Sequence, residues 1–478
     1  MLFPTYEFVG FFLIVFTLGI FLKKRVRAYK YFLLFASLIF YSFWSLNFLG
    51  LLTTDILINY FILRLTAKSP HKNLYLIAGL GVNLLYLGFF KYYNFFVDSL
   101  FQLLNIFQLQ FSFSVLQILT PIGISFYTFR IISHLVDCYK NQLDCPNLLD
   151  YAVYIAYFPQ IGSGPIGRAK QFYEQLNSHD KYDYQIEVVI TLIISGLFKK
   201  YTLSSFLFNF TQLPFSLPDK YSSIDLILAA LAYSCLIYVD FSGYSDLSNA
   251  VSSLLGFKPI ENFDMPYRAL SVQEFWRRWH ISLSEWLKDY LYIPLGGSKK
   301  GKLRKYLNLL VTMIIGGFWH GVGLNFIIWG AIHGCALIIN HLWKDLLQAI
   351  QPKKQLPNKQ ANNLWNSLAS ICYFLLTFSF VTVSWIFFNS PNYDNALKFI
   401  KGIFSSGVSQ SYFNIWQLYV ALFTVMLINF AGDKISNTFS KILAKPHLIL
   451  QTLFVSSLIY TVLRLGPNTV PPFIYFNF

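Results

Sequence analysis

The sequence predicts an all-α protein that crosses a membrane many times. Its 478 residues are 55% hydrophobic and 19% aromatic but only 12% charged, which is too apolar for a soluble globular chain. Apolar runs such as "NLYLIAGLGVNLLYLGFF" and "SICYFLLTFSFVTVSWIFF" recur along the chain. A helix of about twenty such residues spans a hydrocarbon core of roughly 30 Å. These runs also lack the polar outer face that a large soluble core would need.

The net charge of +15 is distributed in short basic clusters between the apolar runs. Examples are residues 23–27 and 299–305, and the clusters do not share one face. Cytoplasmic loops of membrane proteins collect Lys and Arg in this way, so the charge is explained by topology and not by nucleic-acid binding.

Apolar lengths and basic clusters together predict about 11–12 transmembrane helices, with both termini outside and the basic clusters inside. Because "KKRVR" follows the first span, we expect that span to be retained and not cleaved as a signal. We treat 1–478 as a single integral-membrane domain with a polar linker around 351–363. The expected spans are 3–22, 31–50, 51–67, 74–97, 113–136, 187–207, 224–243, 306–325, 326–343, 364–388, 414–431 and 448–464.

Two segments do not fit this predicted topology of alternating membrane crossings. The Pro- and Gly-rich stretch "YFPQIGSGPIGR" suggests that 151–167 is a re-entrant segment, although an ordinary exposed loop has the same composition. Lys199 and Lys200 interrupt an apolar run, and we expect them to mark a helix end at the membrane interface.

Residues 257–305 form an amphipathic segment that we place on the cytoplasmic side, since it has no run long enough to cross and holds ten of the 37 Lys and Arg residues. Ser271 and Glu274 match a capping box, which predicts a helix from about Val272. That helix would carry the tryptophans, arginines and histidine of "EFWRRWHISLSEWL". It fits an interfacial helix at headgroup level, and it equally fits the inner wall of a site.

His320 stands out because it lies fourteen residues beyond Tyr306 within an apolar helix. At 1.5 Å per residue this places it about 21 Å above the cytoplasmic edge, where an ionisable side chain indicates function. The neighbouring Gly316, Gly317 and Gly321 would allow another backbone to approach closely. A helix–helix hydrogen bond is the alternative role for this histidine.

A further polar stretch, "YVDFSGYSDLSNA", contains Asp240 and Asp246 directly after an apolar run. Carboxylates at membrane depth must face a cavity or a partner. They could orient a histidine, stabilise helix packing or pair with an arginine. No glycosidase carboxylate pair, GxSxG elbow, P-loop or HExxH motif is present, and the five cysteines lack metal-ligand spacing, so we expect no metal. A mid-membrane histidine above a basic aromatic block suggests acyl transfer from a thioester donor to a hydroxyl.

The segments "PIGISFYTF", "YFPQIGSGPIGR", "VDFSGYSDLSNAVSSLLGFKPIENFDMPY", "EFWRRWHISLSEWLKDYLYIPLGGSKKG" and "GGFWHGVGLNFIIWGAIHG" resemble those of the membrane-bound O-acyltransferase (MBOAT) family, in its bacterial alginate O-acetyltransferase-like branch. The resemblance implies a helical bundle around a funnel, with His320 as the catalytic histidine and His280 as the second motif histidine. The chain departs from the family pattern at Phe318, Arg130, His134 and Cys138. The residues expected to contact substrate are Trp276, Arg277, Arg278, Trp279, Asp240, Tyr244, Trp319 and Asn325.

The resemblance also implies a reaction. Acetyl-CoA would serve as donor co-substrate with no bound cofactor. The acceptor would be an envelope polysaccharide, reached directly or through a periplasmic or membrane-anchored acyltransferase partner, and the location would be the bacterial inner membrane. Transfer of D-alanine or a longer acyl chain is an alternative within the enzymes. A transporter or flippase for a lipid-linked sugar is the alternative of another class.

Overall fold

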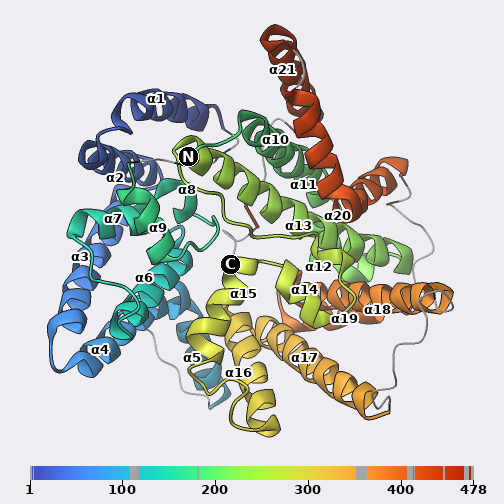
Figure 1. Cartoon of the computed structure of the whole chain (residues 1–478). Coiled ribbons are helices and arrows are strands. Elements are labelled where there is room, and N and C mark those ends of the chain that lie inside the picture. Colours follow the sequence, from blue (N-terminus) through green and yellow to red (C-terminus); the bar gives the residue numbers. More distant parts are fainter. Residues whose placement is uncertain are drawn as a thin grey trace. The chain divides into compact units, whose positions relative to one another are not determined.

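A computed structural model shows a chain built of helices, and no strand occurs among the residues that it describes (Figure 1). Two compact units can be distinguished: Met1–Val189 with Leu247–Ile260, and Ile190–Asp246 with Glu261–Phe478. Helices α10 (Ile186–Leu197) and α13 (Ser223–Leu254) each contribute to both units. The structure describes residues 3, 5–107, 116, 118–179, 182–350, 363–405, 413, 415–444, 447–467 and 473–474.

The first unit contains nine of the labelled helices among its described residues, and a π-helical turn at Gly88–Tyr92 joins α4 to α5. Their bounds are α1 Tyr6–Leu22, α2 Val26–Ser42, α3 Leu46–Lys68, α4 Lys72–Leu87, α5 Tyr93–Ile106, α6 Ile124–Tyr139, α7 Leu148–Ala156, α8 Phe158–Ile161 and α9 Ala169–Asn177.

The second unit holds the rest, with π-helical turns at Phe198–Leu203 and Lys288–Tyr292 and short 3₁₀ turns at Pro218–Lys220 and Pro266–Arg268. The remaining helices are α11 Ser204–Phe208, α12 Gln212–Ser216, α14 Val272–Arg278, α15 Ile281–Leu287, α16 Lys302–His320, α17 Leu324–Ile350, α18 Asn363–Asn389, α19 Tyr393–Ile403, α20 Trp416–Leu443 and α21 Leu448–Leu465.

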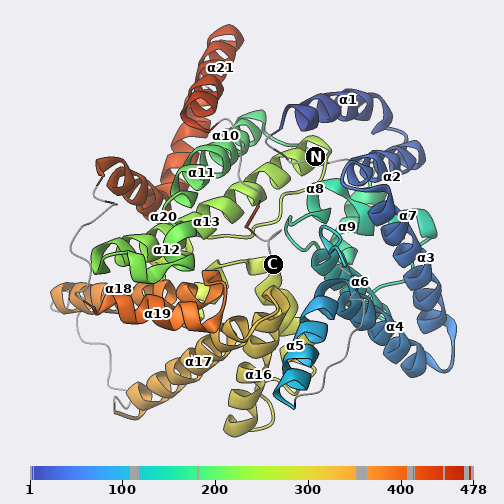
Figure 2. The same ribbon diagram turned by 180° about the vertical axis from the view of Figure 1, so that it is seen from behind.

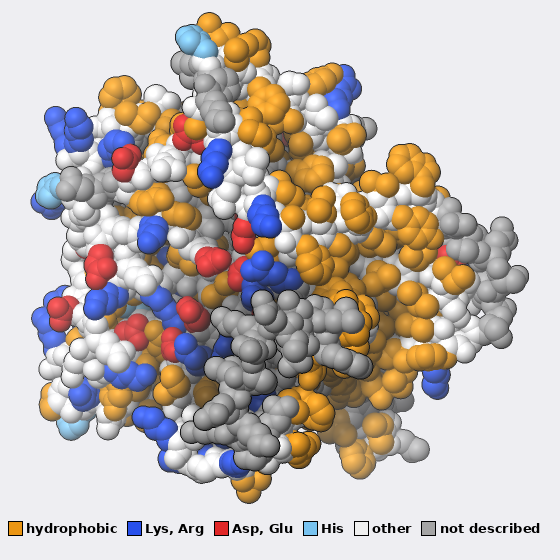
Figure 3. Space-filling model, turned by 45° about the vertical axis from the view of Figure 1, so that its right-hand side comes forward, with side chains coloured by type: hydrophobic (Ala, Val, Ile, Leu, Met, Phe, Trp, Pro, Cys, Tyr) orange, Lys and Arg blue, Asp and Glu red, His pale blue; other side chains and the backbone are white. Residues whose placement is uncertain are grey.

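Six helical segments of the described chain are long and apolar enough to cross a membrane by length and composition. They are Leu46–Lys68, Lys72–Ile106, Ser223–Leu254, Leu324–Ile350, Leu368–Asn389 and Trp416–Leu443. Apolar side chains gather over the right-hand part of the face in Figure 3, as a lipid-facing surface requires, whereas charged side chains are interspersed on the left. The other expected spans are shorter or broken in the described chain: within 113–136 the described helix begins at Ile124, and 187–207 is divided by the π-helical turn. Residues 351–362 of the expected linker lie outside the described chain.

The segment 151–167 is buried within the first unit, and this excludes the exposed loop. Its irregular backbone is satisfied by protein: Ser37 Oγ accepts from the Phe158 amide at 3.2 Å, and the Tyr154 hydroxyl donates to the Gly167 carbonyl at 2.9 Å. Burial against protein is what allows non-helical backbone at membrane depth, which is consistent with the re-entrant reading.

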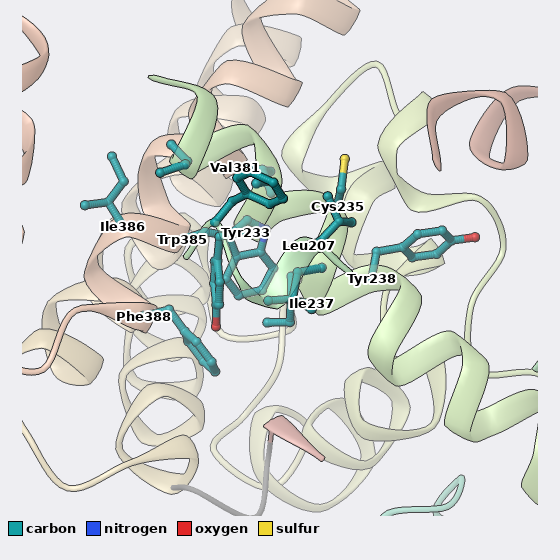
Figure 4. Packing of buried hydrophobic residues seen from close by; sticks show 14 of the residues in the cluster. Leu207, Tyr233, Cys235, Ile237, Tyr238, Val381, Trp385, Ile386 and Phe388 are labelled. Atoms are coloured by element: carbon teal, nitrogen blue, oxygen red, sulfur yellow. The ribbon is translucent and has the colours of Figure 1, made fainter. Parts of the chain in front are cut away.

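The core of the second unit forms where α13 packs among α14, α18 and α20. Figure 4 shows Tyr233 and Ile237 of α13 near Val381 and Trp385 of α18. The neighbouring helices α16 and α17 lie side by side in both ribbon views (Figures 1 and 2). A Cβ on Gly317 would lie 2.3 Å from the Phe326 carbonyl oxygen, so glycine is needed for this close approach. The expected role of this glycine is therefore confirmed.

Candidate active site

His320 is the last residue of α16, which runs unbroken from Lys302. Its side chain is buried between three aromatic rings, with centroid distances of 4.7 Å to Trp319, 5.2 Å to Trp329 and 5.2 Å to Phe388. The carbonyl end of a helix carries partial negative charge, which favours a positive charge there. The position therefore suits a histidine that takes up a proton during a reaction.

Four tryptophans connect this histidine to the amphipathic segment. Trp329 lies 5.8 Å from Trp276 and 5.6 Å from Trp385, and Trp385 lies 5.1 Å from Trp279 between ring centroids. Trp276 and Trp279 come from α14 and its end, whereas Trp329 and Trp385 come from α17 and α18. The structure thus brings two of the expected substrate residues into the same aromatic cluster as His320.

His333 is a member of this cluster that the sequence reading missed. The Trp276 indole donates to His333 Nδ1 at 3.2 Å, and His333 Nε2 lies 2.9 Å from Ser384 Oγ. Because Nδ1 accepts, Nε2 must carry the hydrogen and donate to Ser384. Ser384 in turn donates to the Val381 carbonyl at 2.7 Å. The chain of hydrogen bonds fixes the orientation of Trp276. In the sequence, the spacing of four residues between Trp329 and His333 places both on one face of a helix and could have indicated that His333 belongs to the cluster.

His280 does not lie inside a helix, so the single helix expected from Val272 onward is wrong. Helix α14 ends at Arg278 and α15 begins at Ile281, and His280 has a left-handed φ of 43°. Its Nδ1 lies 3.1 Å from Asn262 Oδ1. This oxygen also accepts from Ser282 Oγ at 2.9 Å, so Nδ1 carries the hydrogen and Nε2 is the basic nitrogen. Burial lowers the pKa of His280 to about 3, and the ring is therefore neutral.

The two adjacent arginines have different roles. Arg278 forms ion pairs with Asp264 at 2.6 Å and Glu274 at 2.9 Å, so its guanidinium holds the segment together. Arg277 is exposed and has no such ion pair among the described residues. The predicted cap is confirmed, since Ser271 Oγ accepts from the Glu274 amide at 3.2 Å. The Glu274 carboxylate accepts from the Leu270 amide and not from the Ser271 amide.

A pocket of about 400 Å³ opens beside Trp276. Lys288, Lys305 and His341 give it a basic lining, while Trp276 and Met313 form apolar walls. The complete lining is Gln273, Trp276, Ser284, Leu287, Lys288, Tyr292, Ser298, Lys305, Leu309, Thr312, Met313, Leu337 and His341. Such a combination suits a ligand with one anionic and one apolar part.

Asp240 and Asp246 pair with lysines and not with histidine or arginine. Asp240 forms a buried ion pair with Lys200 and accepts from Ser204 Oγ at 2.6 Å. Asp246 pairs with Lys199 at 2.8 Å. The α-helix α10 ends at Leu197, directly before these lysines, and both lie in the π-helical turn at Phe198–Leu203, which holds their ammonium groups against the carboxylates of α13. These contacts stabilise helix packing, and they give no support to Asp240 as a substrate contact.

Two other expected site residues also have internal roles. Asn325 donates to the carbonyl oxygens of Phe387 at 3.1 Å and Ser390 at 3.0 Å, and so caps the end of α18. Tyr244 stacks on Phe473 at 4.9 Å. Trp319, by contrast, lies directly against His320. Among the described residues no group of three or more His, Cys, Asp or Glu could hold a metal ion.

Comparison with known proteins gives this site its context. The model of the membrane-bound O-acyltransferase family matches residues 100–386. The chain is 35% identical over 511 residues to the probable alginate O-acetylase of Pseudomonas putida, which covers all of both chains. It is 36% identical over 445 residues to the peptidoglycan O-acetyltransferase of Helicobacter pylori (86% of this chain, 81% of that one). A teichoic acid D-alanyltransferase of Streptococcus thermophilus is 30% identical over 301 residues (59% and 71%).

The family model covers more than half of the chain, including α14 and α16 with both motif histidines, and the first two relatives match most of its length. The protein therefore belongs to the membrane-bound O-acyltransferase family and is a membrane O-acyltransferase.

Proposed function

We propose that this enzyme moves an acetyl group from acetyl-CoA to hydroxyls of a cell-envelope polysaccharide, directly or through a partner acyltransferase, at the bacterial inner membrane. One observation carries the donor side of the proposal. The basic pocket has Trp276 as a wall, and two ring contacts, Trp276 to Trp329 and Trp329 to His320, lead from that wall to the histidine.

The pocket matches the two chemical parts of an acyl-CoA. Lys288 and Lys305 would contact the phosphates, because cationic donors form strong charge-assisted hydrogen bonds with phosphate oxygens, and His341 would add a neutral donor. The apolar walls at Trp276 and Met313 would take the pantetheine arm. The acyl end would then approach the aromatic cluster around His320.

The reaction needs one base. As the acceptor hydroxyl attacks the thioester carbonyl, His320 takes the hydroxyl proton, the C–O bond forms and the C–S bond breaks. The departing CoA thiolate then receives the proton from the imidazolium, which restores the neutral base. The aromatic walls around His320 keep bulk water away from the thioester, so hydrolysis is disfavoured.

The acceptor is proposed from the relatives, whose names refer to alginate, peptidoglycan and teichoic acid. Transfer of D-alanine remains the second candidate, because the D-alanyltransferase relative is 30% identical. Inner membranes supplied with labelled acetyl-CoA or with an activated D-alanyl donor distinguish these two substrates.

The central test is His320→Gln, which keeps hydrogen bonding and much of the volume but removes the base. We expect acetyl transfer from labelled acetyl-CoA to fall by about 10²–10⁴-fold, the usual contribution of a general base. Expression and detergent stability should stay near wild type. Lys398→Gln, at an exposed position of α19, is the matched control with unchanged transfer. Near wild-type transfer by well-folded His320→Gln would refute the assignment. Flux of a lipid-linked sugar without acetylation would favour the transporter.

A further inference from the structure

The first unit contains a buried arginine without a counter-charge. Arg130 of α6 is 1% exposed. None of its three guanidinium nitrogens has a hydrogen-bond acceptor, and no carboxylate pairs with it, among the residues that the structure describes. Arginine stays protonated in proteins, so this is a permanent positive charge in a low-dielectric interior. Buried charges normally have a partner of opposite sign.

The immediate neighbours of Arg130 are aromatic and neutral. Its guanidinium carbon lies 4.3 Å from the ring centroid of Tyr154 and 5.9 Å from that of Phe172. The nearest oxygens are the neutral hydroxyls of Tyr154, Tyr157 and Tyr173, and the Tyr154 hydroxyl interacts with the guanidinium without reaching normal hydrogen-bond geometry. Ring faces attract a cation, but they leave the directional N–H groups of the guanidinium without acceptors.

The same residues offer further donors. Tyr157 and Tyr173 are buried, and neither hydroxyl makes a hydrogen bond of normal length and angle within the described chain, although the Ser252 side chain lies near the Tyr157 hydroxyl. Both rings are close to the arginine's own contacts, since Tyr157 lies 5.1 Å from Phe172 and Tyr173 lies 5.5 Å from Tyr154. We call Arg130, Tyr154, Tyr157, Phe172 and Tyr173 the Arg130 cluster.

We propose that the Arg130 cluster binds a small monovalent anion, either a halide or a short carboxylate. The guanidinium supplies the charge and a fork of N–H donors, and the tyrosine hydroxyls supply additional donors. A buried water molecule could accept a hydrogen bond but would not neutralise the charge. A phosphate would bring two negative charges to a site with one unpaired cation, so a monovalent anion matches the charge.

The experiment uses the full-length protein in detergent, with its thermal midpoint measured at constant ionic strength. Isethionate, which is too large for an enclosed site, is replaced stepwise by chloride or by acetate. A ligand that binds only the folded state raises stability with its concentration, so we expect a saturable rise of several degrees. The anion with the lower half-saturating concentration shows whether the site prefers a halide or a short carboxylate. An unchanged midpoint in both titrations would overturn the proposal.

Two variants separate this site from general salt effects. Arg130→Gln should abolish the response, whereas Arg25→Gln, an exposed arginine of the same unit, should keep it. Tyr157→Phe removes one hydroxyl donor and should raise the half-saturating concentration several-fold, which provides a test even if Arg130→Gln fails to fold. A wild-type response in Arg130→Gln, or in Tyr157→Phe when Arg130→Gln does not fold, would refute the site.

Discussion

The ion pair between Lys200 and Asp240 provides a quantitative test of the second unit. The two side chains are 4% and 2% exposed, and the carboxylate also accepts from Ser204 Oγ at 2.6 Å and from the Ile474 amide at 3.0 Å. Asp240→Asn would leave the Lys200 ammonium buried without its counter-charge. Removing one partner of a buried pair costs about 3–5 kcal/mol, so the free energy of unfolding should fall by that amount.

The double variant Lys200→Met, Asp240→Asn separates pairing from other effects. An apolar side chain of similar length can replace a buried charge with little loss, so the double variant should recover most of the stability. Denaturant unfolding in detergent, followed by tryptophan fluorescence, measures the four proteins of the cycle. Equal stability of Asp240→Asn and wild type would refute the argument, as would a double variant with the summed losses of the two single variants.

The same cycle tests Asp240 as a substrate contact. If its role is packing, acetyl transfer per folded molecule should be similar in the double variant and wild type. Were Asp240 instead to bind the acceptor, the double variant would fold well and remain inactive. Transfer measured against the amount of folded protein distinguishes these two outcomes.

Three more predictions follow from the site. His280 has a pKa near 3 when folded and about 6.5 when unfolded, so the unfolded state binds the extra proton between these values. The contribution of His280 to stability should be complete above pH 6.5 and fall below it by about 1.4 kcal/mol per pH unit, so the slope of unfolding free energy measured from pH 7 to 5 should be smaller by that amount in His280→Gln. Arg278→Ala should destabilise the protein by ~1–3 kcal/mol through its paired carboxylates, whereas Arg277→Ala should spare stability and raise the KM for acetyl-CoA. Equal effects of the two arginine variants would contradict this division. Gly317→Ala should lower the free energy of unfolding by ~1–3 kcal/mol, because the added Cβ forces α16 away from α17. Gly10→Ala is the control, since its Cβ would meet open space, and the thermal midpoints of both variants test the difference.

The sequence predicted the elements whose signal is local. The capping box at Ser271 and the glycine contact at Gly317 depend on neighbours in the chain or on a single helix pair. The span expected over 306–325, by contrast, ends earlier in the structure, with His320 as the last residue of α16. The lysine–aspartate ion pairs could not be predicted, because Lys200 and Asp240 are forty residues apart in the sequence. Two lysines within an apolar run also fit a position at the membrane interface equally well. The aromatic cluster likewise joins residues from α14, α17 and α18. The sequence therefore singled out Trp276, Trp279 and His320, but neither His333 nor the contacts among these residues.

The break at His280 shows why periodicity alone misread the amphipathic segment. A helical pattern continues across residues 272–287, and yet His280 adopts a left-handed backbone, which costs of order 1–2 kcal/mol for a residue other than glycine. The hydrogen bond to Asn262 and the ring contact with Phe241 at 4.6 Å offset this cost. The kink directs Trp279 toward Trp385 and ends α14 after the turn that carries Trp276 and Arg278. The structure thus favours a positioning role for His280: its neutral, hydrogen-bonded ring fixes the geometry of the tryptophans that surround His320, the proposed base.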